Sequence, residues 1–124
     1  MKEKTSEQGF TINGMTIAPG VVETIISLAA GEVPGVAGVG TAGPISAIAA
    51  AFNAGKAIPS TGIKVSINEE EKIVVDITIQ AYYGYRLAEV ADGVREAIAD
   101  AMGGQLGAEV ASVDVYVDSL EAEE

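Results

Sequence analysis

The first candidate site in this sequence is a set of glycines whose spacing is typical of nucleotide binding. Gly38, Gly40 and Gly43 fit the GxGxxG pattern with which a strand-to-helix turn holds the pyrophosphate of a dinucleotide. A segment this rich in glycine matches that pattern easily by chance, and the rest of the chain offers no second mononucleotide-binding half. We therefore interpret the pattern as a flexible junction after a strand, and we expect no nucleotide cofactor.

Carboxylates provide the second candidate site. Asp76, Asp114 and Asp118 fall on the polar side of alternating strand patterns, so we expect them to share the open face of one sheet. Hard cations such as calcium and magnesium bind carboxylate oxygens, but no EF-hand spacing is present. Lys64 and Lys72 are expected near the same surface as partners for the carboxylates. The pattern favours a solvated sheet face over a metal site, and it leaves open whether a cation binds there.

The side chains used by the commoner catalytic mechanisms are missing from the sequence. It contains no cysteine, histidine or tryptophan, which removes thiolate and imidazole chemistry and the usual ligands of zinc and iron. The serines have no histidine to activate them, and no Ser-Lys motif is recognisable. We expect no catalytic residues, no cofactor and no bound metal.

The charge balance limits the partners that the chain can have. Its 7 Lys and Arg against 18 Asp and Glu give a formal net charge of -11, which repels a nucleic-acid backbone and an anionic membrane surface alike. Residues 33–55 carry no charge, but their prolines and glycines argue against a membrane-spanning helix. Residues 1–8 lack the pattern of a secretory signal. We expect a cytoplasmic protein that neither binds nucleic acid nor inserts directly into a membrane.

Hydrophobic periodicity indicates the elements that must position these residues. Apolar residues recur at helical spacing in two segments, and they alternate with polar residues in the strands. A turn of three glutamates joins two of the strands into a hairpin. The predicted elements are a helix over 19–31, a strand over 33–39, strands over 63–67 and 75–81, a helix from 87 that ends at Gly103 and Gly104, and a strand over 113–118.

Together these elements predict an α/β fold of the two-layer α+β type. A chain of 124 residues is long enough for one core, and a two-layer sandwich buries the single apolar face of every element. We expect a mixed or antiparallel sheet of about four strands with both helices on one face, in the order α-β-β-β-α-β. The predicted organisation is a disordered arm over 1–9, a single domain over 10–120 with an Ala/Gly-rich insert at 41–61, and an acidic tail over 121–124.

An aromatic cluster lies at the junction between the hairpin and the second helix. Tyr82, Tyr83 and Tyr85 surround Gly84 there, and Arg86 follows. Tyrosine and arginine are favoured at binding hot spots, although packing at a tight strand-to-helix turn is the alternative for at least one of the tyrosines. We predict a partner-binding surface made of this cluster and of apolar residues of the adjoining insert, namely Ile45, Ile48 and Phe52.

Several sequence blocks follow one another in a specific order. EVPGVAGV over 32–39 comes after GMTIA over 14–18, and GIKV over 62–65 comes before IVVDI over 73–77. The Tyr-Gly pair at 83–84 then leads to EVA at 89–91 and to the valine-rich segment 110–117. Over nearly the whole chain this order resembles the alkaline shock protein family of Gram-positive bacteria, the Asp/Gls envelope stress response domain.

The resemblance implies a small cytoplasmic protein without known catalytic activity, linked to cell-envelope homeostasis under stress. In some members of that family a separate anchor protein holds the chain at the membrane, and members are prone to self-association. Two places depart from the pattern: residues 41–61 are longer and more apolar than the charged linker expected there, and Tyr85 and Arg86 replace polar residues. Both departures lie where a partner could bind.

The resemblance and the composition together predict an envelope stress response protein that acts as a scaffold or interaction module. We expect it near the cytoplasmic face of the membrane, peripheral to it through a membrane-anchor partner, and associated with other copies of itself. The alternative is a small-molecule-binding regulatory domain, in which the insert at 41–61 caps a pocket between the sheet and the helices.

Overall fold

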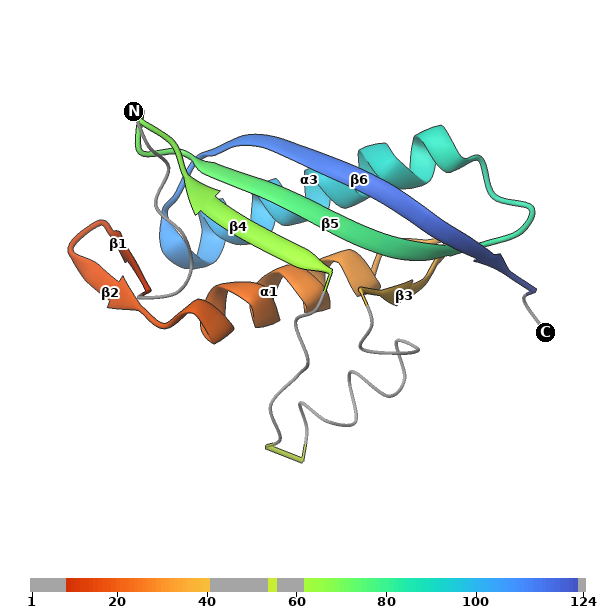
Figure 1. Ribbon diagram of the computed structural model, residues 1–124, viewed down its shortest axis with the longest axis horizontal. Helices are drawn as coiled ribbons and strands as arrows, with labels where there is room; N and C mark the ends of the chain where they lie inside the picture. The colour runs from red at the N-terminus through yellow and green to blue at the C-terminus, as the bar shows by residue number, and fades with distance from the viewer. Residues whose placement is uncertain (1–8, 41–53, 56–61, 123–124) are drawn as a thin grey trace.

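A computed structural model describes residues 9–40, 54–55 and 62–122 of the chain (Figure 1). The predicted order α-β-β-β-α-β is confirmed, and a short hairpin that was not predicted precedes it. Residues 1–8 of the predicted arm over 1–9, most of the insert at 41–61 and residues 123–124 lie outside the described residues. The elements are β1 (Phe10–Ile12), β2 (Met15–Ile17), α1 (Pro19–Gly31), β3 (Val36–Val39), β4 (Ile63–Ile67), β5 (Ile73–Tyr82), α3 (Leu87–Leu106) and β6 (Val110–Glu121).

The main sheet is built around β5. Strands β3 and β4 both pair with β5 in antiparallel fashion, β4 along its first half and β3 along its second half. Strand β6 pairs with β5 in parallel over the length of β5, from Ile73 to Tyr82. Because β6 occupies one side of β5, β3 and β4 lie end to end along the other side (Figure 1). The sheet is therefore mixed, with four strands in the part of the chain that the structure describes.

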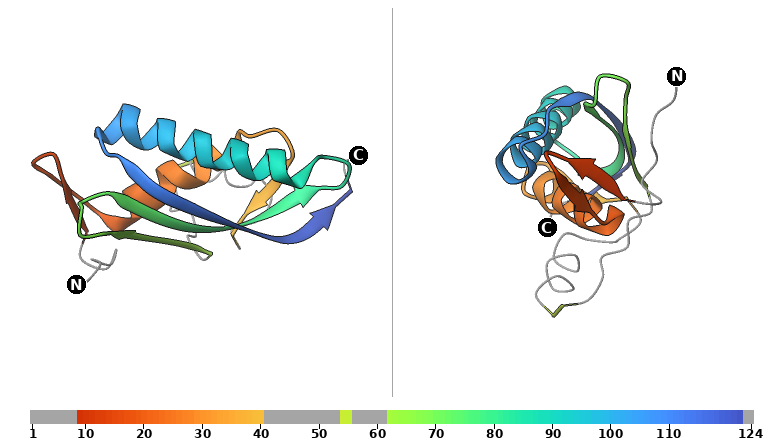
Figure 2. Two further views of the ribbon diagram at one scale, coloured as in Figure 1. Left: turned by 90° about the horizontal axis from the view of Figure 1, so that it is seen from above. Right: turned by 90° about the vertical axis from the view of Figure 1, so that its left-hand side faces the viewer.

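Both helices cover the same face of this sheet, as predicted (Figure 2). The core forms between the two layers, where the inward side chains of β5 meet those of the helices. On α3 the buried positions recur every four residues, which is the spacing that keeps one helix face toward a sheet. The most completely buried of the large side chains are Ile26, Ile73, Ile77, Ile79, Ile98 and Met102.

The second helix is longer than predicted. It continues past Gly103 and Gly104 to Leu106, because Leu106 is buried and anchors one more turn to the core. Gly107 then ends the helix in the left-handed conformation (φ 67°), and its N–H donates to the carbonyl of Gly103 at 3.1 Å. The side-chain amide of Asn13 donates to the carbonyls of Leu106 (3.0 Å) and Gly107 (2.9 Å). The β1–β2 hairpin thus caps the end of α3.

The bounds of three strands also differ from the prediction, and β5 covers Ile73–Tyr82 rather than 75–81. Strand β3 begins at Val36 rather than at residue 33, because the chain turns after α1 with Gly35 at φ 97° and with a hydrogen bond from the N–H of Val36 to the carbonyl of Val33 (3.1 Å). Strand β6 extends on both sides of the predicted 113–118 and includes Glu121, the first residue of the predicted acidic tail. Its length follows from its pairing with β5, which supplies hydrogen-bonding groups over ten residues.

Candidate functional site

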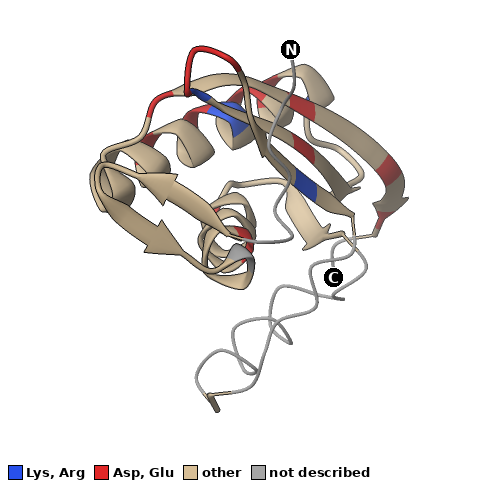
Figure 3. Cartoon of the chain, turned by 60° about the vertical axis from the view of Figure 1, so that its left-hand side comes forward, with Lys and Arg blue, Asp and Glu red and all other residues tan. Residues whose placement is uncertain are grey.

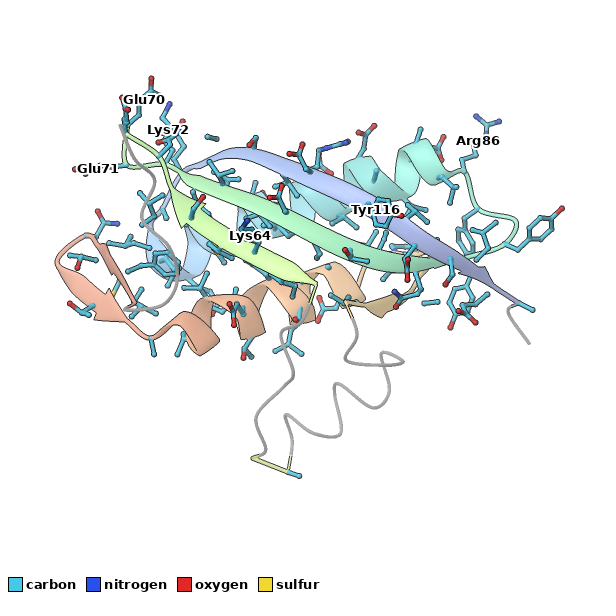
Figure 4. The ribbon with its side chains drawn as sticks, viewed as in Figure 1. Lys64, Glu70, Glu71, Lys72, Arg86 and Tyr116 are labelled. Carbon is cyan, nitrogen blue, oxygen red and sulfur yellow. The ribbon has the colours of Figure 1, made fainter. Side chains whose placement is uncertain are left out.

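The face of the sheet opposite the helices carries a row of charged residues (Figures 3 and 4). In the strand register Lys64 of β4 stands beside Asp76 of β5, and Asp76 stands beside Asp114 of β6. Thr78 and Tyr116 form the next pair on the same face, and Tyr116 is 65% exposed. The alternation of the strands therefore places Asp76 and Asp114 together, as predicted.

Two residues assigned to this face from the sequence lie differently. Lys72 sits at the β4–β5 turn, where its ammonium nitrogen is 3.7 Å from a carboxylate oxygen of Glu70 and 3.4 Å from one of Glu109. Asp118 falls where the register between β5 and β6 shifts by one residue, so it faces no partner residue on β5. Among the described residues no group of three or more acidic side chains is arranged to hold a metal ion.

The glycine pattern belongs to the sheet. Gly38 lies in β3 and Gly40 directly after it, while Gly43 falls outside the described residues. The N–H of Gly40 donates to the carbonyl of Thr78 (2.6 Å), and its carbonyl accepts from the side-chain amide of Gln80 (3.1 Å). Both backbone groups of Gly40 are therefore hydrogen-bonded to β5. A dinucleotide-binding turn needs free backbone N–H groups that donate to the phosphate, and the N–H of Gly40 is not free to do so.

The tyrosine cluster lies where β5 leads into α3. The rings of Tyr82 and Tyr85 are 6.4 Å apart between centroids and inclined at 40°, whereas Tyr83 points away and is 77% exposed. The ring of Tyr85 packs over Gly35, so closely that a Cβ atom on Gly35 would lie 3.0 Å from it. Tyr82 is half-buried and Tyr85 is 40% exposed, so the cluster combines packing with accessible aromatic surface.

Arg86, labelled in Figure 4, extends this surface, which we call the tyrosine corner (Tyr82, Tyr83, Tyr85 and Arg86). Its guanidinium lies 3.7 Å from a carboxylate oxygen of Glu89. The side chains of Arg86 and Glu89 are 84% and 73% exposed, so this ion pair contributes little to stability and leaves the arginine accessible. The insert residues predicted to join the corner, Ile45, Ile48 and Phe52, lie outside the described residues.

A second surface, not predicted from the sequence, lies between the two helices on the side away from the sheet. It is a groove of about 1300 Å³. Apolar side chains line it, most of them half-buried and Val21 exposed, and acidic residues stand among them. Gly93, Ala97 and Ala101 recur every four residues of α3 and keep the groove open, a small-residue pattern that was visible in the sequence. Its lining includes Val21, Ile25, Leu28, Val33, Ala97 and Ala101, with Glu32, Glu96 and Asp100.

A protein-family model matches the sequence over almost the entire chain. The alkaline shock protein 23 family, described by its cell envelope-related function, matches residues 7–122. The chain therefore belongs to this family, as the sequence blocks predicted.

No curated protein matches the chain significantly. A solved structure of a variant of the protein MamM is similar over 84% of each chain, with 24% sequence identity and a TM-score of 0.42. Within the part of the chain that the structure describes, no helix has the length and apolar character needed to cross a membrane.

Proposed function

We propose that this chain is a non-catalytic envelope stress response protein that acts as a scaffold or interaction module at the cytoplasmic face of the membrane. Membership of a family with a cell envelope-related function supports the setting. The absence of cysteine and histidine from the sequence supports a role in binding rather than in catalysis. A separate membrane-anchor protein holds the chain at the membrane, because the net charge of -11 opposes direct contact with anionic lipid.

The observation that carries the proposal is the placement of α1 and α3 on one face of the sheet (Figure 2). The opposite face is left to the solvent, and β6 pairs only with β5 among the described strands. An open face and an open strand edge are surfaces by which a sheet protein binds other chains. The same arrangement favours self-association, in which the outer edge of β6 pairs with that of a second copy.

The tyrosine corner is the contact that we assign to the partner. Tyr83 and Tyr85 offer apolar area with polar tips, and Arg86 is one of the few positive charges in an acidic protein. Side chains of these types make large contributions at the centres of interfaces. The partner surface is accordingly expected to be apolar with a carboxylate placed to receive Arg86.

Co-purification from native membranes tests the proposal. After extraction in a mild detergent under envelope stress, the chain should be recovered in stoichiometric amounts with an integral membrane protein. Replacing Tyr83 and Arg86 by alanine should weaken that recovery, whereas replacing Met15, an exposed apolar residue of the β1–β2 hairpin away from both surfaces, should not. Recovery of the chain alone, and entirely in the soluble fraction, would contradict the proposal.

Small-molecule binding is the second candidate function. The groove between the helices, at about 1300 Å³, is large enough to hold a small molecule, and Gly55 of the insert lies among its lining residues. This groove lies on the side of the helices that faces away from the sheet. The pocket predicted between the sheet and the helices is not available, because core side chains fill that space. A rise in melting temperature with a member of a metabolite library, abolished by a large side chain at Ala97, would favour this function over scaffolding.

A further inference from the structure

We infer that the groove between α1 and α3 is a docking site for a cationic amphipathic helix of a partner protein. The inference rests on the proposed function and deepens it, because it gives the chemistry of the partner segment and a second place where it binds. Three features of the groove carry it: its shape, its lining and the sign of the charges beside it.

The shape of the groove fits a helix. Helices α1 and α3 run side by side in opposite directions (Figures 1 and 2). The groove follows α1 and the residues that flank it, from Ala18 to Pro34, and it follows α3 from Gly93 to Gln105. At 1.5 Å per residue, this length corresponds to about 20 Å, or roughly four turns of a third helix. An extended strand would gain nothing here, because the groove walls are helices whose backbone groups are already bonded.

The lining supplies apolar contacts at the spacing that a helix needs. Ile25 and Leu28 on α1 and Ala97 and Ala101 on α3 are half-buried, so part of each side chain remains accessible in the groove. The small residues of α3 form the floor on which a partner's larger side chains can rest. An amphipathic helix with apolar residues at i, i+3, i+4 and i+7 would bury this surface, as in other helix-in-groove interfaces.

The charges beside the groove indicate that the partner helix is positively charged. The charged residues that line the groove are acidic, namely Glu32, Glu96 and Asp100. The described cations lie elsewhere: Lys64 on the open sheet face, Lys72 at the β4–β5 turn, Arg86 at the tyrosine corner, and Arg95 bonded to Asp92 (2.7 Å) and to the carbonyl of Val113 (3.1 Å). Electrostatic complementarity therefore requires lysines or arginines flanking the apolar stripe of the docked helix.

One end of the groove lies next to the tyrosine corner. Pro34 lines one end of the groove, and the next residue, Gly35, lies under the ring of Tyr85. A helix that lies in the groove therefore ends beside the corner, where its following residues reach Tyr83 and Arg86. One partner chain can occupy both surfaces.

A peptide titration tests the inference on the full chain. The probe is a synthetic amphipathic helix of about 14 residues, which spans the groove at about 1.5 Å per residue, with a Leu/Ala stripe flanked by lysines. A second peptide has glutamates in place of the lysines. Fluorescence anisotropy should show saturable 1:1 binding of the lysine peptide, at least tenfold weaker binding of the glutamate peptide, and weakening with added salt.

Matched variants locate the binding site. Ala97→Lys places a long cation in the groove and should weaken peptide binding at least tenfold, whereas Ala99→Lys, exposed on the same helix outside the groove, should not. Glu96→Lys with Asp100→Lys changes exposed residues without altering the core, and should have a similar effect. Asp114→Lys with Asp118→Lys makes the same charge change on the opposite side of the sheet, and should leave most of the binding intact. The inference would be overturned if the lysine peptide showed no saturable binding, or if the Glu96→Lys, Asp100→Lys variant and the Asp114→Lys, Asp118→Lys variant lost peptide affinity equally.

Failure of this inference can be distinguished from failure of the proposed function. If the unaltered chain co-purifies with a membrane protein and the Glu96→Lys, Asp100→Lys variant does so equally well, the groove is not the docking site and the proposed function stands. If neither form co-purifies, the proposed function is wrong, and the peptide titration still decides whether the groove binds a cationic helix.

Discussion

Gly40 and Gly62 together occupy the place of a single residue opposite Thr78. The N–H of Gly40 donates to the carbonyl of Thr78 (2.6 Å), and the N–H of Thr78 donates to the carbonyl of Gly62 (2.8 Å). One residue of a continuous antiparallel strand would exchange both of these bonds with its partner. Strands β3 and β4 are therefore two halves of one strand, with the insert leaving and returning at the same point of the sheet.

This geometry predicts that the insert can be removed without loss of the fold. Deleting residues 41–62, so that Gly40 precedes Ile63, should give one unbroken strand from Val36 to Ile67. We expect the free energy of unfolding to stay within about 1 kcal/mol of the original, because loop length contributes only about 0.6 kcal/mol per doubling. Urea denaturation measures it. Loss of a cooperative transition would show instead that the insert belongs to the core.

The packing of Tyr85 over Gly35 makes Gly35 the most demanding glycine near the tyrosine corner. A Cβ atom there would lie 2.7 Å from Val90 Cγ2 and 3.0 Å from the tyrosine ring. Gly84 has a similar positive φ (104° against 97°) but open space around it. Gly84→Ala should cost about 1 kcal/mol of stability through backbone strain, and Gly35→Ala about 1–3 kcal/mol more through overpacking. Equal losses in chemical denaturation would show that Tyr85 moves aside freely.

Ser27 is a polar residue within a buried part of α1. It is 1% exposed, and its hydroxyl has no hydrogen-bond partner among the described residues. Ser27→Ala should raise the free energy of unfolding by about 1 kcal/mol, because an unsatisfied buried hydroxyl is removed and alanine is the better helix former. Ser112→Ala, at an exposed position, serves as the control. A loss of stability in the Ser27 variant would reveal that the hydroxyl is bonded after all.

Self-association through the edge of β6 should respond to salt. Asp114, Asp118 and Glu121 are exposed along this strand, so pairing two copies edge to edge brings like charges together. Screening shortens the Debye length from about 30 Å at 0.01 M to 3 Å at 1 M, so association should strengthen as sodium chloride is added. Sedimentation velocity measures the dimer fraction. Dissociation by salt would indicate that oppositely charged surfaces meet, and therefore a different interface.

Alternation and helical periodicity predicted the main elements because each of them has one buried face. The β1–β2 hairpin was missed, since its strands have only three residues each, although Asn13-Gly14 between them is the favoured two-residue turn. The end of α3 was placed too early because glycines at 103 and 104 outweighed the burial of Leu106, which depends on tertiary packing.

The candidate surfaces were predictable to different extents. Asp76 and Asp114 could be placed on one face because strand alternation fixes the side on which a residue points. The ion pair between Lys72 and Glu109 depends on where β6 begins, which is a long-range relationship. The groove requires the relative position of two helices that are distant in sequence, and the joining of β3 to β4 requires the pairing of both with β5. Neither relationship is encoded in a local pattern.

Flotation of the purified chain tests most directly the central claim, that it reaches the envelope through another protein. The chain is mixed with vesicles prepared from native membranes, and separately with protein-free liposomes made from the lipids of the same membranes. Given the net charge of -11, we expect it to float with the native vesicles and to stay at the bottom of the gradient with the liposomes. Flotation with the protein-free liposomes, or with neither preparation, would contradict the account.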